Sequence, residues 1–148
     1  MTTWTEDSRY VLRLPDGAVV RGRGLRYGLP SGPTPDFGVY LLATPPEDLE
    51  WPFRWIDCPD FRCPRYTAAA LDALTEAHGR SHGERVEVAC GGGVGRTGLA
   101  LATLAVMAGV APREAVGWVR RRYHPRAVET PWQRRWVRRL EPPRPRSV

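Results

Sequence analysis

The first 60 residues alternate short apolar segments with turn-forming residues. This pattern is typical of β-strands separated by turns and loops. Residues 9–14 and 18–21 flank Pro15-Asp16-Gly17, which predicts two strands joined by a tight turn. Further short strands are expected over residues 38–42 and 51–56, and long Gly- or Pro-containing loops over residues 22–37 and 57–64.

Helical patterning dominates the rest of the chain. The expected helices cover residues 67–77, 97–108 and 112–123, and a last helix opens at Thr130-Pro131, with Thr130 as its cap. One strand, over residues 85–89, runs into a glycine-rich loop over residues 91–95. Strands first, then a strand–loop–helix unit, then helices together predict an α/β fold, with a small mixed central sheet flanked by helices.

Length and composition place the chain among ordinary globular proteins. Its 148 residues are 42% hydrophobic and 26% charged, which excludes wholesale disorder. We expect one domain over residues 1–140, followed by a disordered Pro/Arg-rich tail over residues 141–148. No apolar run approaches a membrane span, and the acidic N-terminus lacks a signal-peptide pattern. A cytoplasmic location with reduced thiols is therefore expected.

Charge is distributed unevenly along the chain. Every basic residue is an arginine, and residues 111–148 carry 11 of them against three acidic residues. We expect most of these arginines to form solvated helix faces and salt bridges. The alternative is a surface for an anionic partner, although no recognised nucleic-acid motif accompanies it.

The most informative segment is a glycine-rich loop between a strand and a helix. Glycines tolerate positive φ, so successive N–H groups can point at one anion, and the helix N-terminus adds positive charge. Residues 86–98 are therefore expected to form a phosphate-binding loop. The residues expected to bind the phosphate are Gly91, Gly92, Gly93, Val94, Gly95 and Arg96.

Three motifs compete for this loop. A Walker A loop would need Gly in place of Cys90 and Lys in place of Arg96. The dinucleotide pattern Gly-x-Gly-x-x-Gly fits literally, but its acidic partner would have to be Glu114, in a predicted helix. The pattern Cys-x5-Arg-Thr fits at every fixed position, from Cys90 to Thr97. There a thiolate attacks phosphorus, arginine binds two phosphoryl oxygens as a fork, and Thr97 donates to the sulfur. A buried structural cysteine is the remaining reading.

The Cys90 to Gly98 signature resembles that of the cysteine-based protein tyrosine and dual-specificity phosphatases, as a small bacterial-type member. Two weaker segments support the resemblance in the right order. Residues 58–64 look like the mobile loop of that family that carries a general acid, and residues 129–133 look like its glutamine loop. The resemblance implies the phosphotyrosine protein phosphatase-like fold. This chain departs from the family at Ala89, usually His, and at Cys58, usually Trp.

The resemblance also implies a mechanism. Cys90 attacks phosphorus, Asp60 protonates the leaving oxygen, and a phosphocysteine intermediate is hydrolysed by a water that Gln133 positions. Asp57 is the rival acid, and a turn or cap is its structural alternative. No metal or cofactor is required, because Arg96 and backbone N–H groups neutralise the charge.

Several further side chains receive simpler expectations. Gln133 as a solvated helix residue is the alternative to its catalytic role, and Glu129 is a partner for Arg96 or another arginine. The three histidines, His78, His82 and His124, are read as surface residues without metal-ligand spacing. A redox role, in which Cys58 or Cys63 traps an oxidised Cys90, stays open.

These observations predict a phosphoprotein phosphatase acting on phosphotyrosine, with phosphoserine and phosphothreonine as further substrates. The variable positions of the loop carry no charge, which favours phosphoprotein over a multiply phosphorylated lipid. The alternatives are a catalytically weak module that binds phosphorylated partners, and a phosphoinositide or nucleotide phosphatase.

Overall fold

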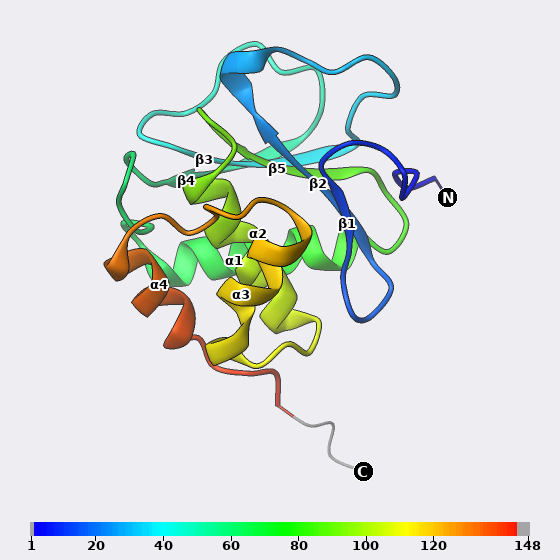
Figure 1. The fold of residues 1–148 in the computed structure, drawn as a ribbon. Coiled ribbons are helices and arrows are strands. Elements are labelled where there is room, and N and C mark those ends of the chain that lie inside the picture. The colour runs from blue at the N-terminus through cyan, green and yellow to red at the C-terminus, as the bar shows by residue number, and fades with distance from the viewer. Residues whose placement is uncertain (1, 145–148) are drawn as a thin grey trace.

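A computed structural model describes residues 2–144 and shows a five-stranded sheet with four α-helices on one side (Figure 1). The sheet order is β1-β2-β5-β3-β4; β1 pairs antiparallel with β2, and the other pairs are parallel. The strands are β1 (Val11–Arg13), β2 (Val19–Gly24), β3 (Phe37–Leu42), β4 (Phe53–Asp57) and β5 (Val86–Cys90). The helices are η1 (Leu25–Tyr27), α1 (Thr67–Arg80), α2 (Gly95–Met107), α3 (Pro112–Arg122) and α4 (Pro131–Arg138). The expected α/β class with a mixed sheet is confirmed.

The two faces of the sheet differ in chemistry because side chains alternate along each strand. The face toward the helices is apolar, and α2, buried along nearly its whole length, packs against β5 and β2. The strand residues of this core are Leu12, Val20, Phe37, Val39, Leu41, Ile56, Val86 and Val88. A sheet covered on this face explains why β5 is apolar wherever it faces α2.

The opposite face carries a buried charged network. Glu87 of β5 is fully buried and accepts hydrogen bonds from Arg21 at 2.7 Å, Arg23 at 2.9 Å and Tyr40 at 2.6 Å. Burial by itself would raise the pKa of Glu87, but the hydrogen bonds from Arg23 and Arg21 outweigh it and lower that pKa. The network therefore binds β2, β3 and β5 together through one ionised carboxylate.

Most expected element boundaries agree with the structure, with two corrections. The long loop over residues 22–37 is shorter than expected, because β2 continues to Gly24 and η1 follows it. Helix α1 ends at Arg80, three residues beyond the expected range of 67–77. Helix α2 ends before Gly109, whose φ of 116° is left-handed, as expected.

The chain ends differ in what the structure describes. Residues 141–144 have no regular secondary structure, and the rest of the expected disordered tail, residues 145–148, lies outside the described residues. Among the described residues, no helix combines the length and the apolar character needed to cross a membrane.

Candidate active site

Cys90 is the last residue of β5, and its sulfur is held by two hydrogen-bond donors. The hydroxyl of Thr97 donates to Sγ over 3.1 Å, and the backbone N–H of Gly93 donates over 3.2 Å. Thr97 lies in the first turn of α2, where free N–H groups and the helix dipole add positive potential. Donors on the sulfur stabilise its anionic form, so the arrangement suits a thiolate.

The loop from Cys90 to α2 turns its carbonyl groups outwards. The carbonyl of Gly91 accepts from the N–H of Arg26 at 3.0 Å, and that of Gly93 accepts from the Tyr123 hydroxyl at 2.6 Å. In a trans peptide the N–H points opposite to the C=O. The N–H groups of Gly92 and Val94 therefore point to the inside of the loop, where an anion can accept from them.

Two glycines of this loop are required by space. Gly93 has a φ of 74°, and a Cβ there would lie 2.5 Å from the backbone nitrogen of Gly24. A Cβ at Gly95 would collide with the carboxylate of Glu129. Close packing of the loop against β2 therefore requires glycine at position 93, whereas a Cβ at Gly91 or Gly92 would meet no atom closer than 3.5 Å.

Arg96 brings a buried guanidinium to the same loop. Its Nη1 donates to the carbonyl of Cys58 at 3.1 Å, and its Nη2 lies 3.5 Å from Oδ1 of Asp60. Its Nε is buried and has no hydrogen-bond partner among the described residues. A buried donor without an acceptor is costly, and a bound oxyanion would supply the missing acceptor.

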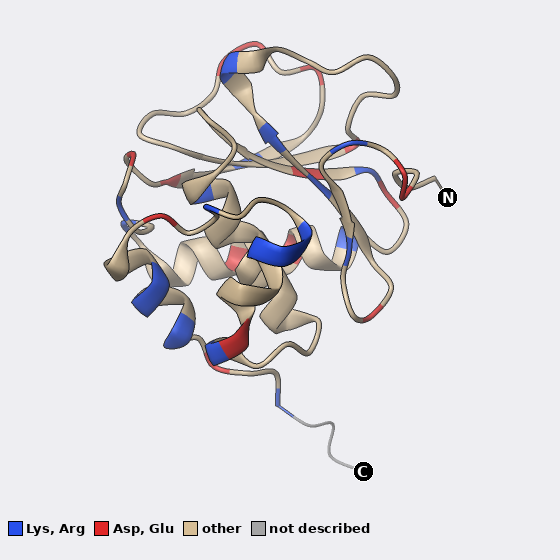
Figure 2. Cartoon of the chain, viewed as in Figure 1, with Lys and Arg blue, Asp and Glu red and all other residues tan. Residues whose placement is uncertain are grey.

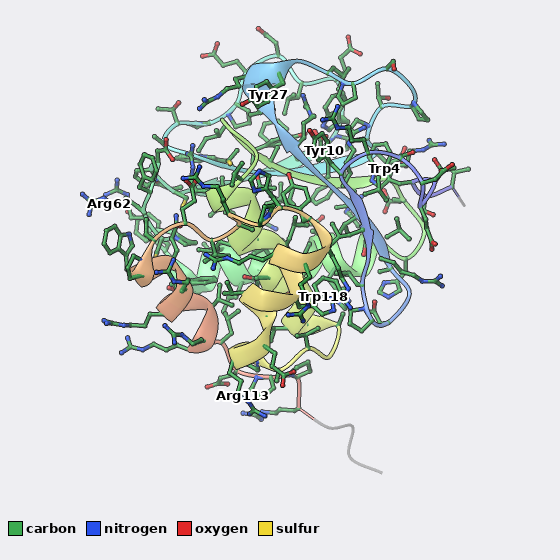
Figure 3. The ribbon with its side chains drawn as sticks, in the orientation of Figure 1. Trp4, Tyr10, Tyr27, Arg62, Arg113 and Trp118 are labelled. Carbon is green, nitrogen blue, oxygen red and sulfur yellow. The ribbon has the colours of Figure 1, made fainter. Side chains whose placement is uncertain are left out.

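These groups meet in a pocket of about 310 Å³. Cys90, Arg96 and Asp60 all line it. Two exposed aromatic side chains, Tyr27 and Phe61, also line it. Tyr27 belongs to η1, which follows β2, and it lies on the side of the sheet away from the helices (Figure 3). The pocket thus combines a polar floor with an aromatic rim.

The two rival acids occupy different surroundings. Asp60 lies in the pocket, where its side chain is about half exposed and accepts from the backbone N–H of Phe61 at 3.0 Å. Asp57 does not line the pocket, and it pairs with Arg65 at 3.1 Å. Of these two carboxylates, Asp60 is therefore the one placed where a general acid would have to lie.

Four expected site residues do not line the pocket: Gly91, Gly93, Thr97 and Gln133. Gly93 and Thr97 nevertheless donate to the sulfur of Cys90, whereas Gln133 is held at the start of α4. Gln133 is buried, so the alternative of a solvated residue is wrong. Its Oε1 accepts from the N–H of Thr130 at 3.1 Å, completing a capping box at the start of α4. Its Nε2 donates at 2.9 Å to the carbonyl of Arg62, whose side chain points outwards (Figure 3). In this geometry Gln133 links α4 to the loop that carries Asp60, and both ends of its amide have partners outside the pocket.

The two other thiols differ from Cys90 in their surroundings. Burial raises the pKa of Cys58 to about 12, and burial also raises the pKa of Cys63. Their sulfurs donate to the carbonyls of Arg62 and Trp132 respectively, each over 3.4 Å. Neutral thiols are weak nucleophiles, which disfavours the redox role considered from the sequence.

Three cationic or titratable residues at the pocket were not singled out from the sequence as site residues. Arg26, Arg126 and His124 line it, and Arg26 comes from η1, within the segment expected to be a loop. No local pattern marks these residues, because tertiary packing brings them together. Glu129 also lines the pocket, but among residues 2–144 its carboxylate forms no salt bridge with an arginine, contrary to expectation.

The arginine-rich C-terminal third has the expected solvated helix faces, because several of its arginines are exposed on α3 and α4. The expected salt bridges are not found: in the described part of residues 111–148 no arginine forms one. Arg120 instead donates to the carbonyls of Ala127 and Val128 at 2.8 and 2.9 Å, and Arg134 donates to that of Glu129 at 3.0 Å. These bonds hold the segment before α4, while other arginines remain exposed on α3 and α4 (Figure 2).

Two of the motifs considered for the glycine-rich loop, the dinucleotide pattern and the Walker A loop, do not fit the structure. Glu114 lies in the first turn of α3, not at the end of a strand, so the dinucleotide reading is wrong. The Walker A reading fails at its first and penultimate positions, Cys90 and Arg96, and both of these side chains line the pocket.

Comparisons with known proteins point to one family. The family model described as the Swiss Army Knife protein DSP-PTPase phosphatase domain (PTP-SAK) matches residues 62–144, which include the whole loop and α4 but not Asp60. The crystal structure of Tk-PTP in the active form is similar, with 31% identity, a TM-score of 0.57, and coverage of 69% of this chain and 74% of that one.

A glycine-to-alanine mutant form of Tk-PTP gives a similar result: 29% identity, a TM-score of 0.59, and coverage of 69% and 73%. A comparison with curated protein sequences finds no match. The family model covers more than half of the chain and includes its Cys-x5-Arg-Thr loop. The chain therefore belongs to the DSP-PTPase family of cysteine-based phosphatases.

Proposed function

We propose that this protein hydrolyses phosphate monoesters of proteins through a phosphocysteine intermediate on Cys90. The observation that carries the proposal is the sulfur of Cys90, which accepts hydrogen bonds from Thr97 and Gly93 at the base of a pocket. A thiolate so placed attacks phosphorus, the S–P bond forms, and the P–O bond to the leaving group breaks.

The phosphoryl group is bound by the loop and by Arg96. Inward N–H groups of the loop and the guanidinium donate to the three non-bridging oxygens, and the unpartnered Nε of Arg96 gains an acceptor. The same donors stabilise the charge of the transition state, and the two side chains closest to it, Cys90 and Arg96, are buried. This chemistry needs no metal ion.

Asp60 is the proposed general acid. It protonates the oxygen that leaves and then, as carboxylate, takes a proton from the water that attacks the phosphocysteine. The proposal is supported by its position at the pocket and by its 3.5 Å separation from Nη2 of Arg96, which holds the carboxyl near the phosphoryl site. Gln133 contributes by holding the Asp60 loop against α4, and its expected role with water stays a sequence prediction.

Phosphotyrosine is the proposed main substrate, with phosphoserine and phosphothreonine as further ones. The exposed rings of Tyr27 and Phe61 at the rim can pack against an aryl group. Arg26 and Arg126 at the same pocket favour acidic residues beside the phosphorylated one. The extent of the domain and a cytoplasmic location stay predictions from the sequence.

The test is hydrolysis of p-nitrophenyl phosphate in the presence of EDTA, with Cys90→Ser as control. We expect activity that EDTA leaves unchanged and that Cys90→Ser abolishes. Activity that requires a divalent metal, or that survives Cys90→Ser, would overturn the cysteine mechanism. Phosphate binding without turnover in the unmodified protein would instead support the alternative of a phosphate-binding module.

A further inference from the structure

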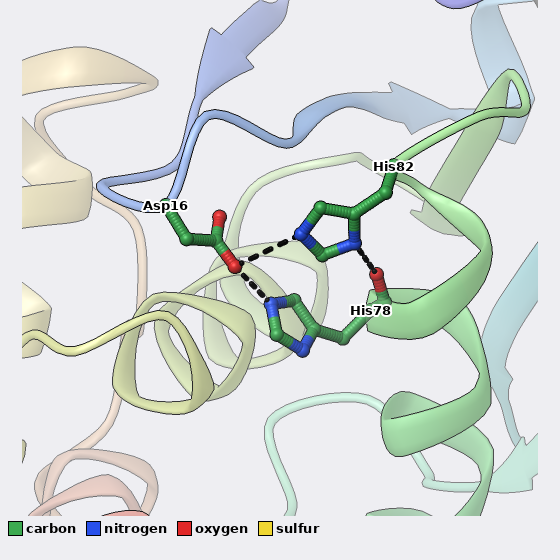
Figure 4. Close-up of side chains that lie close together, drawn as sticks. All are labelled: Asp16, His78 and His82. Atoms are coloured by element: carbon green, nitrogen blue, oxygen red, sulfur yellow. Dashed lines mark hydrogen bonds and ion pairs between the residues drawn. The ribbon is translucent and has the colours of Figure 1, made fainter.

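A second group of titratable side chains lies where the β1–β2 turn meets the end of α1. Asp16, His78 and His82 converge there, and one ligand atom from each lies within 4.8 Å of the other two (Figure 4). None of the three lines the pocket of Cys90. The expectation that these histidines lack metal-ligand spacing is wrong for His78 and His82. They are four residues apart, and Ser81, with φ −65° and ψ −14°, continues the helical path, so both rings face the same side.

Hydrogen bonding around His82 shows which of its two ring nitrogens carries the hydrogen in the neutral form. Its Nδ1 lies 3.0 Å from the carbonyl oxygen of His78, which can only accept, so Nδ1 carries a hydrogen. In the neutral ring, Nε2 then holds a lone pair, and it lies 3.2 Å from Oδ2 of Asp16. Two acceptors at this distance repel each other unless a cation lies between them. Metal-binding histidines are commonly oriented in the same way: one ring N–H donates to a backbone carbonyl, and the other ring nitrogen binds the metal.

The carboxylate of Asp16 is held in place from its other side. Its Oδ1 accepts from the N–H of Ala18 at 3.2 Å, so Oδ2 is directed to the histidines and lies 2.6 Å from Nε2 of His78. Two backbone hydrogen bonds of Leu14 close the turn: its N–H donates to the carbonyl of Ala18 at 2.7 Å, and its carbonyl accepts from the N–H of Gly17 at 2.9 Å. Burial by itself would raise the pKa of Asp16, but hydrogen bonds from Ala18 and His78 outweigh it and lower that pKa. The three groups are therefore arranged before any ligand binds, which reduces the entropic cost of binding.

We propose that Asp16, His78 and His82 bind one divalent transition-metal ion, with Zn²⁺ as the preferred ion and water as the fourth ligand. Two imidazoles and a carboxylate are a donor set that suits zinc. Metal–ligand bonds of about 2.0–2.1 Å in a tetrahedral site separate ligand atoms by about 3.3 Å. Oδ2 of Asp16 and Nε2 of His82 already have this spacing. Nε2 of His78 lies closer to Oδ2 and would have to move about 0.7 Å away from it when the metal binds. The ion would join the β1–β2 turn to α1, two elements 62 residues apart in sequence.

The direct test is a calorimetric titration of Zn²⁺ into the full chain carrying Cys90→Ser, which removes the competing active-site thiol. We expect one site, with an affinity that Asp16→Asn or His82→Gln lowers at least tenfold. His124→Gln, in the same background, is the matched control and should leave the affinity unchanged. His82 is exposed, so its substitution leaves the core intact, and circular dichroism checks the fold of each variant.

Thermal unfolding gives a second readout that does not depend on the phosphatase activity. Zinc at about a hundredfold excess over its dissociation constant should raise the Tm by about 5 °C or more, and Asp16→Asn should abolish the rise. In the chain with Cys90 intact, Asp16→Asn should leave the turnover of p-nitrophenyl phosphate in EDTA unchanged, because Asp16 does not line the pocket of Cys90; this separates the metal site from the proposed catalytic one. Failure of zinc to bind, or binding that Asp16→Asn and His82→Gln leave unchanged, would overturn the proposal.

Discussion

Arg96 illustrates how much of the proposed chemistry depends on single side chains. Its guanidinium is buried; Nη1 donates to the Cys58 carbonyl, and Nε has no partner within residues 2–144. A planar fork can donate to two oxygens at once, while an ammonium group acts as a point charge. The positive charge alone is therefore not what the pocket requires.

Arg96→Lys is expected to reduce kcat by about 10²–10³-fold and to weaken binding of phosphate and vanadate. The charge is retained, so the loss reports the lost fork geometry. Steady-state kinetics and vanadate inhibition measure both effects. A lysine variant nearly as active as the original protein would contradict the two-oxygen role of Arg96.

Asp60→Ala should slow turnover most for substrates with poor leaving groups, such as phosphotyrosine, and least for activated aryl phosphates. General acid catalysis contributes about 10²–10⁴-fold, and activated leaving groups need less protonation. A series of aryl phosphates of graded leaving-group ability measures the dependence.

Asp57→Ala is the matched control for that series, because its carboxylate pairs with Arg65 outside the pocket. It should leave the leaving-group dependence largely intact. If Asp57→Ala reproduces the dependence and Asp60→Ala does not, the assignment of the acid is off by three residues.

At the scale of elements, local patterns predicted the structure well where an element is defined by its own sequence. The capped start of α4 at Thr130 and the left-handed stop of α2 at Gly109 follow from residue chemistry alone. The end of β2 could not be predicted from its Gly-rich sequence, because its last residue, Gly24, is fixed by pairing with Cys90. The pattern also gave no sign of η1.

The candidate site was predictable to the same extent. The spacing from Cys90 to Arg96 and Thr97 is local, and the geometry brings these residues together. The partners of Gln133 depend on how α4 packs against the loop before α1, and the cluster of Asp16 with His78 depends on a contact across the fold. Long-range contacts of this kind leave no pattern in one sequence.

The network on the far face of the sheet gives a prediction for the elements that position the loop. Glu87→Gln should lower the free energy of unfolding by about 3–5 kcal/mol, because it leaves Arg21 and Arg23 buried without a full counter-charge. Glu84→Gln, at a partly exposed pair with Arg80, is the matched control and should cost about 0–1 kcal/mol. Urea unfolding measures both.

The same variant has an expected pH dependence. The pKa of Glu87 is lowered in the folded protein, so its stabilisation is fully present above the unfolded value of about 4.3 and is lost as the pH falls through the lowered pKa. The difference between Glu87→Gln and the original protein should therefore shrink below about pH 4. A difference that stays constant on acidification would mean that the charge of Glu87 is not what stabilises the sheet.

The whole molecule has a net charge of +6, and its excess of positive charge lies in residues 111–148, which have 11 arginines against three acidic residues. Blue segments mark arginines on α4 and at the end of α3 (Figure 2). Some of these side chains hold the backbone before α4, so only part of this charge is free to attract a partner. Besides Arg96, the pocket is lined by two further arginines, Arg26 and Arg126.

Phosphopeptides with acidic flanking residues should have a lower KM than neutral ones, and their KM should rise more steeply with salt. Charges that attract a substrate through solvent are screened over a Debye length of about 8–10 Å at physiological ionic strength. Kinetics at low and high salt with matched acidic and neutral peptides measure this. Equal salt dependence for both peptides would mean that Arg26 and Arg126 do not select substrates by charge.

The proposed mechanism requires a phosphoryl group covalently bound to Cys90, and this intermediate can be trapped. The Asp60→Ala variant, slow in the second step because it lacks the base, is mixed with an activated aryl phosphate, quenched with denaturant at neutral pH, digested and analysed by mass spectrometry. We expect the peptide containing Cys90 to gain the mass of one phosphoryl group, with Cys58 and Cys63 unmodified. A turning-over enzyme whose phosphoryl group is found on another residue, or on none, would contradict the proposed mechanism.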